Sequence, residues 1–69
     1  MDIDVRKSNA AQPYYFNILA SGNNKELARS SENYTNKNDC IAAAKLIKRD
    51  AGSATIWDMT ASKPEMVEL

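Results

Sequence analysis

The sequence predicts an α+β fold in the order strand–strand–strand–helix–strand, a β(3)-α-β unit whose antiparallel sheet carries one helix on a face. Three observations predict it. In the first third of the chain apolar side chains alternate with polar ones, the period of a half-buried strand. From Cys40 to Ala51 apolar residues recur three and four positions apart, the period of an amphipathic helix. A short β-type segment then follows.

The three early strands follow from this alternation. Ile3 and Val5 alternate with charged residues, and residues 8–13 interrupt them as a hairpin loop. Residues 14–21 give the clearest strand, and one of its faces should point to the core: Tyr14, Phe16, Ile18 and Ala20. The turn at residues 21–25 contains Gly and Asn, which tolerate positive φ. Residues 26–30 predict a third strand, in which Leu27 is the one large apolar side chain.

The helix is predicted to begin near Asn36, whose side-chain oxygen can cap the first turn. Asp39, three residues later, is an acid that the helix dipole favours. Gly52 is expected to end the helix as its C′ residue. The buried stripe is small in volume, which allows a close approach to the sheet: Cys40, Ala43, Ala44, Ile47 and Ala51.

The last strand, residues 54–59, arrives alone after the helix and needs a sheet edge. A chain of 69 residues buries only about 60% of the surface that it exposes when unfolded, so it usually needs additional stabilisation. One cysteine and no histidine exclude an intrachain disulfide and argue against a zinc site. We therefore expect a homodimer, and the candidates for strand exchange are Ala54, Ile56, Trp57 and Met59.

A single domain is expected over residues 1–60. Residues 61–69 contain Pro64 and little periodicity, so they are expected to form a flexible tail. The first residues lack the pattern of an export signal, which favours a cytoplasmic protein, and no apolar run is long enough to cross a membrane.

The residue types present argue against catalysis. Without histidine, Cys40 has no partner to activate it, and its place in the apolar stripe favours a buried space-filler. Glu32 beside Tyr34 could act as an acid–base pair, but a structural strand-to-helix turn is the favoured interpretation. We expect no enzyme activity, no metal and no cofactor, and we leave binding to another protein open.

Nucleic-acid binding is the alternative function. Nine basic and nine acidic residues cancel, which argues against this role because phosphate neutralisation supplies most of the affinity for nucleic acids. A weak module of this kind would use sheet aromatics and a basic helix face. Its candidate contacts are Tyr15, Lys45, Lys48 and Arg49, with Trp57 as a further stacking surface.

Three features occur together in this chain: the strand at residues 15–20, the helix with a small residue near its start, and a turn motif formed by Ser31, Glu32, Tyr34 and Lys37. In these features the chain resembles the YegP-like, or DUF1508, family (UPF0339). It departs from the family in a longer loop at residues 21–25 and in Asn36, which replaces a serine cap. The resemblance implies two units joined into one sheet with swapped C-terminal strands, and it implies no activity, so the turn motif is expected to be structural.

Overall fold

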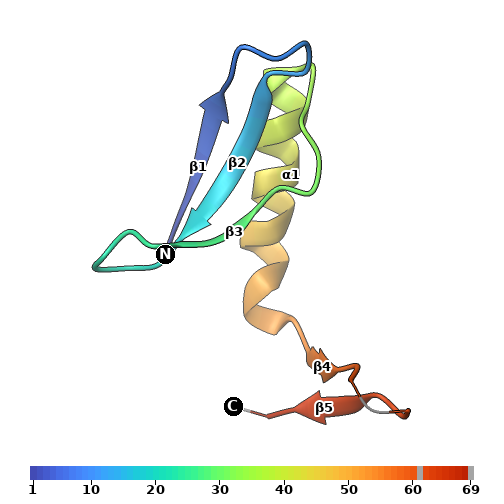
Figure 1. Ribbon diagram of the computed structural model, residues 1–69. Helices are drawn as coiled ribbons and strands as arrows, with labels where there is room; N and C mark the ends of the chain where they lie inside the picture. Colours follow the sequence, from blue (N-terminus) through green and yellow to red (C-terminus); the bar gives the residue numbers. More distant parts are fainter. Residues whose placement is uncertain (61, 69) are drawn as a thin grey trace.

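The computed structural model describes residues 1–60 and 62–68, and within them the chain forms a body and an arm (Figure 1). The body contains a three-stranded antiparallel sheet with one helix on a face, which confirms the predicted α+β class. The body elements are β1 (Asp2–Lys7), β2 (Tyr14–Leu19), β3 (Glu26–Arg29) and α1 (Lys37–Asp50). The arm follows a 3₁₀ turn, η1 (Ala51–Ser53), and consists of β4 (Ile56–Asp58) and β5 (Glu65–Val67).

The sheet has the order β1-β2-β3, so β1 and β3 are its edges. Val5 lies opposite Phe16, and Ile18 lies opposite both Ile3 and Ala28. A bulge between Ile18 and Leu19 shifts the register of β3. The turn between β2 and β3 takes positive φ at Gly22 (88°) and Asn24 (55°), the conformations that these residue types tolerate, as the sequence predicted.

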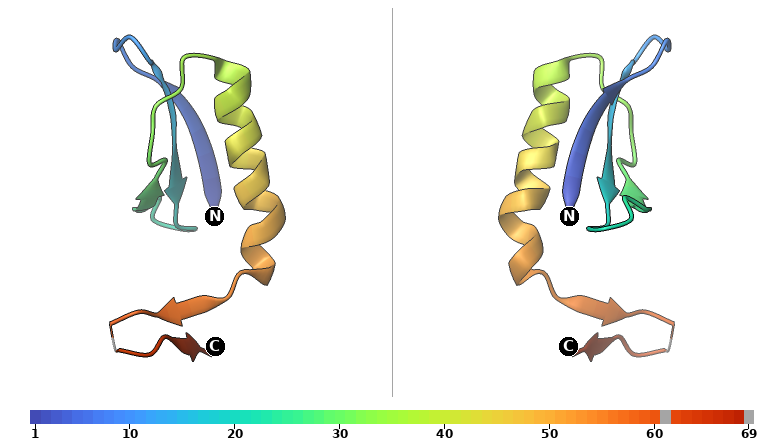
Figure 2. Two further views of the ribbon diagram at one scale, coloured as in Figure 1. Left: turned by 90° about the vertical axis from the view of Figure 1, so that its right-hand side faces the viewer. Right: turned by 90° about the vertical axis from the view of Figure 1, so that its left-hand side faces the viewer.

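The core lies between the sheet and α1, which run side by side in Figure 2. Its buried residues are Phe16, Cys40 and Ala44. Phe16, Tyr14 and Ile18 belong to the core-face residues expected on β2, whereas Ala20 lies outside both β2 and the core cluster. The partly buried side chains around the core are Ile3, Tyr14, Ile18, Tyr34, Ala43 and Ile47. The small residues of α1 allow the close approach that the sequence suggested. So small a core gives a chain of this size little stability of its own.

The two ends of α1 differ in how well the sequence predicted them. Asn36 caps the helix as expected, because its side chain accepts a hydrogen bond from the Asn38 N–H at 2.8 Å. At the C-terminal end, Gly52 was expected to end the helix as its C′ residue, and the conformation expected of such a residue was wrong. Gly52 follows the C-cap Ala51 but takes no positive φ, and the chain tightens into η1 instead.

The arm differs most from the sequence-based expectation. Its first strand is shorter than the predicted residues 54–59, and Ala54 and Met59 lie outside it. Residues 65–67, within the expected flexible tail, pair with β4 as the unforeseen strand β5, whereas residues 61 and 69 lie outside the described residues. The mobility of this segment stays a prediction. Among the described residues, neither β4 nor β5 packs on the sheet or helix of the body, and Figure 2 shows the arm projecting beyond the end of α1.

Candidate functional site

The arm presents apolar side chains to solvent. Ile56 pairs with Val67 and Trp57 with Met66, so each face of the hairpin carries one apolar cross-strand pair. Ile56 and Trp57 are each 54% exposed, and Met66 and Val67 are also exposed. Such a concentration of exposed apolar side chains on a short hairpin is typical of a surface that a partner covers.

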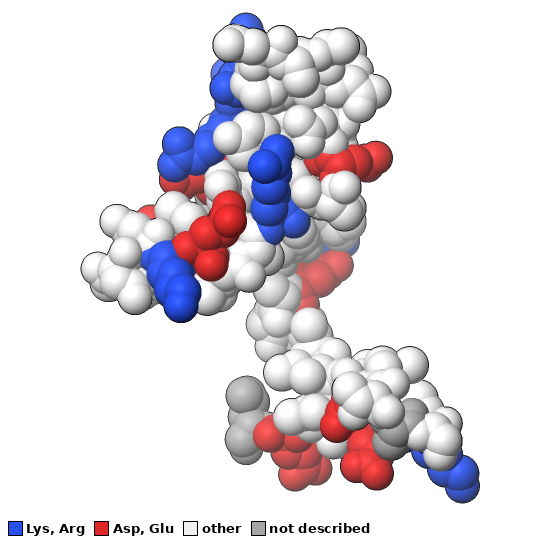
Figure 3. Space-filling model, viewed as in Figure 1, with Lys and Arg blue, Asp and Glu red and all other residues white. Residues whose placement is uncertain are grey.

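Charge is distributed unevenly over the arm (Figure 3). In this view acidic side chains gather along the border where Figure 1 places β5, and the border along β4 shows no charged side chain. The acidic residues of strands β4 and β5 and their flanks are Asp58, Glu65 and Glu68. The β4 border is therefore the one suited to an apolar contact.

Asp58 fixes the turn that follows β4. Its carboxylate accepts hydrogen bonds from the Thr60 hydroxyl at 2.6 Å and from the Thr60 N–H at 2.9 Å. These bonds lower the pKa of Asp58 below its ordinary value of 3.8. The ionised carboxylate therefore favours the folded turn above pH 3.8, and this contribution is lost as the pH falls through the lowered pKa.

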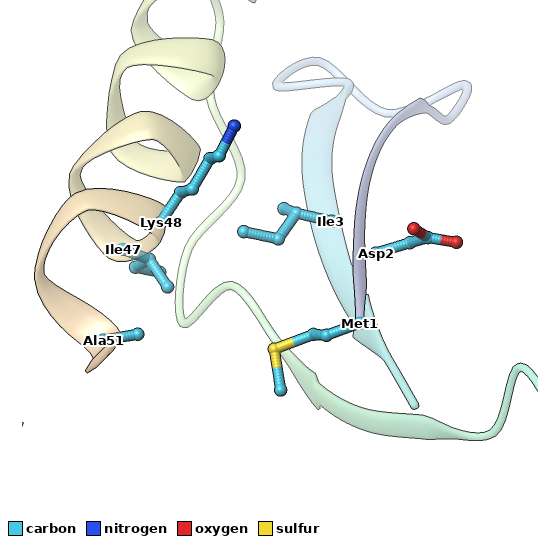
Figure 4. Close-up of a pocket in the computed structure, with 6 residues that line it drawn as sticks. All are labelled: Met1, Asp2, Ile3, Ile47, Lys48 and Ala51. Atoms are coloured by element: carbon cyan, nitrogen blue, oxygen red, sulfur yellow. The ribbon is translucent and has the colours of Figure 1, made fainter. Parts of the chain in front are cut away.

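A hollow of about 440 Å³ lies between the start of β1 and the last turns of α1 (Figure 4). Figure 4 shows Ile3 and Met1 pointing from the sheet towards the helix, whereas Asp2 points away. Ile3 and Ile47 also pack against the core cluster, so the floor of the hollow continues the core. The residues that line the hollow are Met1, Asp2, Ile3, Ile47, Lys48 and Ala51.

The hollow adjoins an unpaired sheet edge. β1 pairs with β2 on one side, and within residues 1–60 and 62–68 no strand pairs with its other side. An unpaired edge offers backbone N–H and C=O groups as a template for a further strand. The body thus places a free edge and an apolar hollow next to each other.

Backbone and hydroxyl hydrogen bonds hold the segment between β3 and α1. The Tyr34 and Tyr14 backbones exchange two hydrogen bonds, N–H to O, at 2.6 and 3.0 Å. The Ser30 hydroxyl accepts from the Phe16 N–H at 3.2 Å and donates to the Glu32 carbonyl at 3.0 Å. The turn motif identified from the sequence contains Ser31, whereas the hydroxyl that makes these bonds belongs to the adjacent Ser30.

The Glu32 carboxylate lies near the Tyr34 phenol. Partial burial raises the pKa of the Tyr34 phenol above its ordinary value, and the nearby Glu32 carboxylate raises it further. The phenol therefore stays protonated at neutral pH and becomes a weaker acid. Ser31, Glu32 and Lys37 are exposed on the surface of the turn.

The candidate nucleic-acid contacts do not gather on one surface. Tyr14 packs on the core beneath α1, so its neighbour Tyr15 stands on the opposite face of the sheet, away from the helix. Tyr15 instead meets Arg29, whose guanidinium lies 4.1 Å from the ring centroid. On the helix, Arg49 pairs with Asp50 at 2.9 Å, and Lys45 and Lys48 are exposed.

Cys40 is fully buried, and this burial raises the pKa of its thiol above the ordinary value of 9.0. The neutral thiol therefore favours the folded chain below pH 9.0, and this contribution is lost as the pH rises through the raised pKa. We expect Cys40 to react with a thiol reagent at pH 8 at least ten times more slowly in the native chain than in denaturant. Equal rates in the two states would contradict a buried thiol.

Within the described part of the chain no group of three or more Cys, Asp or Glu residues is placed to hold a metal ion. In the same residues no helix has both the length and the apolar character needed to cross a membrane. The family described as "Domain of unknown function (DUF1508)" matches residues 9–58, which is most of the chain. No curated protein and no solved structure matches this chain.

Proposed function

Because this chain belongs to the DUF1508 family of domains of unknown function, its role has to be argued from its own geometry, and we propose that it is a small, non-catalytic, cytoplasmic interaction module that works as a homodimer. The observation that carries the proposal is an arm whose described residues expose apolar side chains and include none that is buried, beside a body with an unfilled apolar hollow. In the proposed dimer, each arm docks on the body of the other chain.

The arm and the body each offer an unpaired strand edge and exposed apolar side chains, among the described residues. The free edge of β1 can pair with β4, whose second edge is also unpaired among the described residues. Docking there would place apolar side chains of the arm next to Met1, Ile3 and Ile47, which line the hollow. Covering them on both chains extends a core that is small in the single chain.

Strand alternation assigns the two large side chains of β4 to different surroundings. Ile56 and Trp57 leave opposite faces of the strand. In the proposed dimer Ile56 faces the aliphatic hollow beneath α1. Trp57 then lies on the open sheet face, which carries Tyr15 and where an aromatic ring with one polar atom is well accommodated.

Solution mass tests the dimer. Light scattering over a dilution series should give twice 7.7 kDa, and this mass should persist until dilution reaches the dissociation constant. Trp57 is the one tryptophan of the chain, so its fluorescence reports on the arm alone. We expect its emission to shift to longer wavelength at the dilution where the mass falls. A monomer at all concentrations would overturn the proposal.

Cross-linking tests the exchange of arms. Chains carrying Lys48→Cys, at the rim of the hollow, and chains carrying Thr55→Cys, in the arm, are co-expressed and treated with a short bismaleimide. We expect a covalent heterodimer, because each arm lies at the other chain's hollow, while buried Cys40 stays unmodified. Leu27→Cys is the control for Lys48→Cys, because it is exposed on β3 at the opposite edge of the sheet. Equal cross-linking from position 27 would contradict docking at the hollow.

A further inference from the structure

Strand β5 occupies one of the two edges of β4. The pairing runs from Ile56 with Val67 to Asp58 with Glu65, so it covers the whole of β4 on that side. β5 lies outside residues 9–58, the part of the chain that matches the family. The arm is therefore a two-stranded unit, in which β4 has one edge left for the partner and β5 forms the outer strand.

The sequence of β5 is typical of a protected sheet edge. The strand is three residues long, and Lys63, Pro64, Glu65 and Glu68 lie in or next to it. Short strands, charged side chains and proline are devices by which proteins prevent an edge strand from pairing with further chains. In the view of Figure 3, acidic side chains lie along this border.

Without β5, the second edge of β4 would be open to pairing with further chains. A run of three residues with high β-propensity carries no charge and no proline: Thr55, Ile56 and Trp57. After one edge of β4 had paired with the partner's β1, the other edge would still offer N–H and C=O groups to another chain. Such a contact would add chains without closing, as heterologous interfaces do.

We propose that the exchanged element is the whole two-stranded arm and that β5 is the edge strand that limits assembly to two chains. This inference rests on the proposed homodimer. β4 supplies the contact with the body of the second copy, and β5 covers the side of β4 that would otherwise recruit a third chain. The arm thus combines an attachment strand with its own protection against aggregation.

The test removes the pairing of β5 in the full chain with the double substitution Met66→Pro and Val67→Pro. Proline lacks a backbone N–H donor, so the β4–β5 ladder is lost. The matched control is Met66→Thr with Val67→Thr, which removes apolar volume but keeps both donors and a high β-propensity. Light scattering is recorded from micromolar to millimolar protein, and far-UV circular dichroism checks that the body remains folded.

We expect the wild-type chain and the threonine control to stay at twice 7.7 kDa, whereas the weight-average mass of the proline variant at least doubles over the same range. A proline variant that remains a dimer at all concentrations would overturn the protective role of β5 and leave the homodimer intact. A monomeric proline variant beside a dimeric wild type would also overturn it, because β5 would then be needed for docking itself. A monomeric wild type would remove the homodimer and this inference together.

Discussion

Replacing Phe16 by alanine should unfold a large part of the population at room temperature. Phe16 is 3% exposed and is the largest of the three buried side chains in the core cluster. Removing a buried phenylalanine costs about 3–5 kcal/mol. Domains have a stability of about 0.05–0.15 kcal/mol per residue, which gives roughly 3–10 kcal/mol for a chain of this length. Urea titration followed by circular dichroism measures the loss.

The control for this variant is Leu27→Ala. Leu27 is 56% exposed on the edge strand β3, and surface substitutions of this kind change stability by about 0.5 kcal/mol or less. Both titrations need the same protein concentration, because the stability of a dimer depends on it. A Phe16→Ala chain that unfolds at the wild-type urea concentration would show that the core of the body is not centred on Phe16.

Replacing Ile56 by aspartate should convert the dimer into monomers. Full burial of an isoleucine side chain contributes about 1.5–3 kcal/mol, and Ile56 is 54% exposed before docking, so each contact contributes about 0.8–1.6 kcal/mol. A symmetric pair contains two such contacts, so the lost apolar burial is about 1.6–3.2 kcal/mol, or about 10- to 200-fold in the dissociation constant. Placing a carboxylate in an aliphatic hollow adds a desolvation cost. The midpoint of the dilution series, followed by Trp57 fluorescence, measures the change.

Two further variants locate the contact. Leu27→Asp introduces the same charge at a similarly exposed apolar position on the opposite edge, and it should leave the dissociation constant unchanged within a factor of about three. Trp57→Asp should weaken the dimer less than Ile56→Asp, because Trp57 is assigned to the open face of the sheet. This variant has no tryptophan, so its dimer is followed by light scattering. A larger effect at Trp57 would show that Trp57, and not Ile56, faces the hollow. The exchange of arms would still hold.

Local patterns predicted the body well because each of its elements carries its own signal. The alternation around Phe16 placed β2 and its buried face, and Asn36 marked the start of α1. The spacing of Cys40 and Ala44 identified the face of the helix that is buried. These features depend on residues that are close in the sequence, and such residues determine strand period, helix period and capping.

Features that depend on distant residues were harder to predict. β5 has three residues and too little alternation to stand out, and it forms only because β4 is there to pair with it. Gly52 has the residue type of a helix end, but the tightening into η1 satisfied the last turn without a positive φ. The hollow is formed by the start of β1 and the end of α1, which are distant in the sequence, so no local pattern predicts it.

The short tether of the arm also affects how long two chains stay together. Only residues 51–55 separate α1 from β4, so a pair held by one docked arm keeps the second arm close to the hollow of the other chain. Short tethers of this kind give effective concentrations on the order of millimolar. A contact that opens is therefore remade before the chains drift apart, and complete separation requires both contacts to open at once. Two small, individually weak contacts can in this way give a pair that exchanges its subunits slowly.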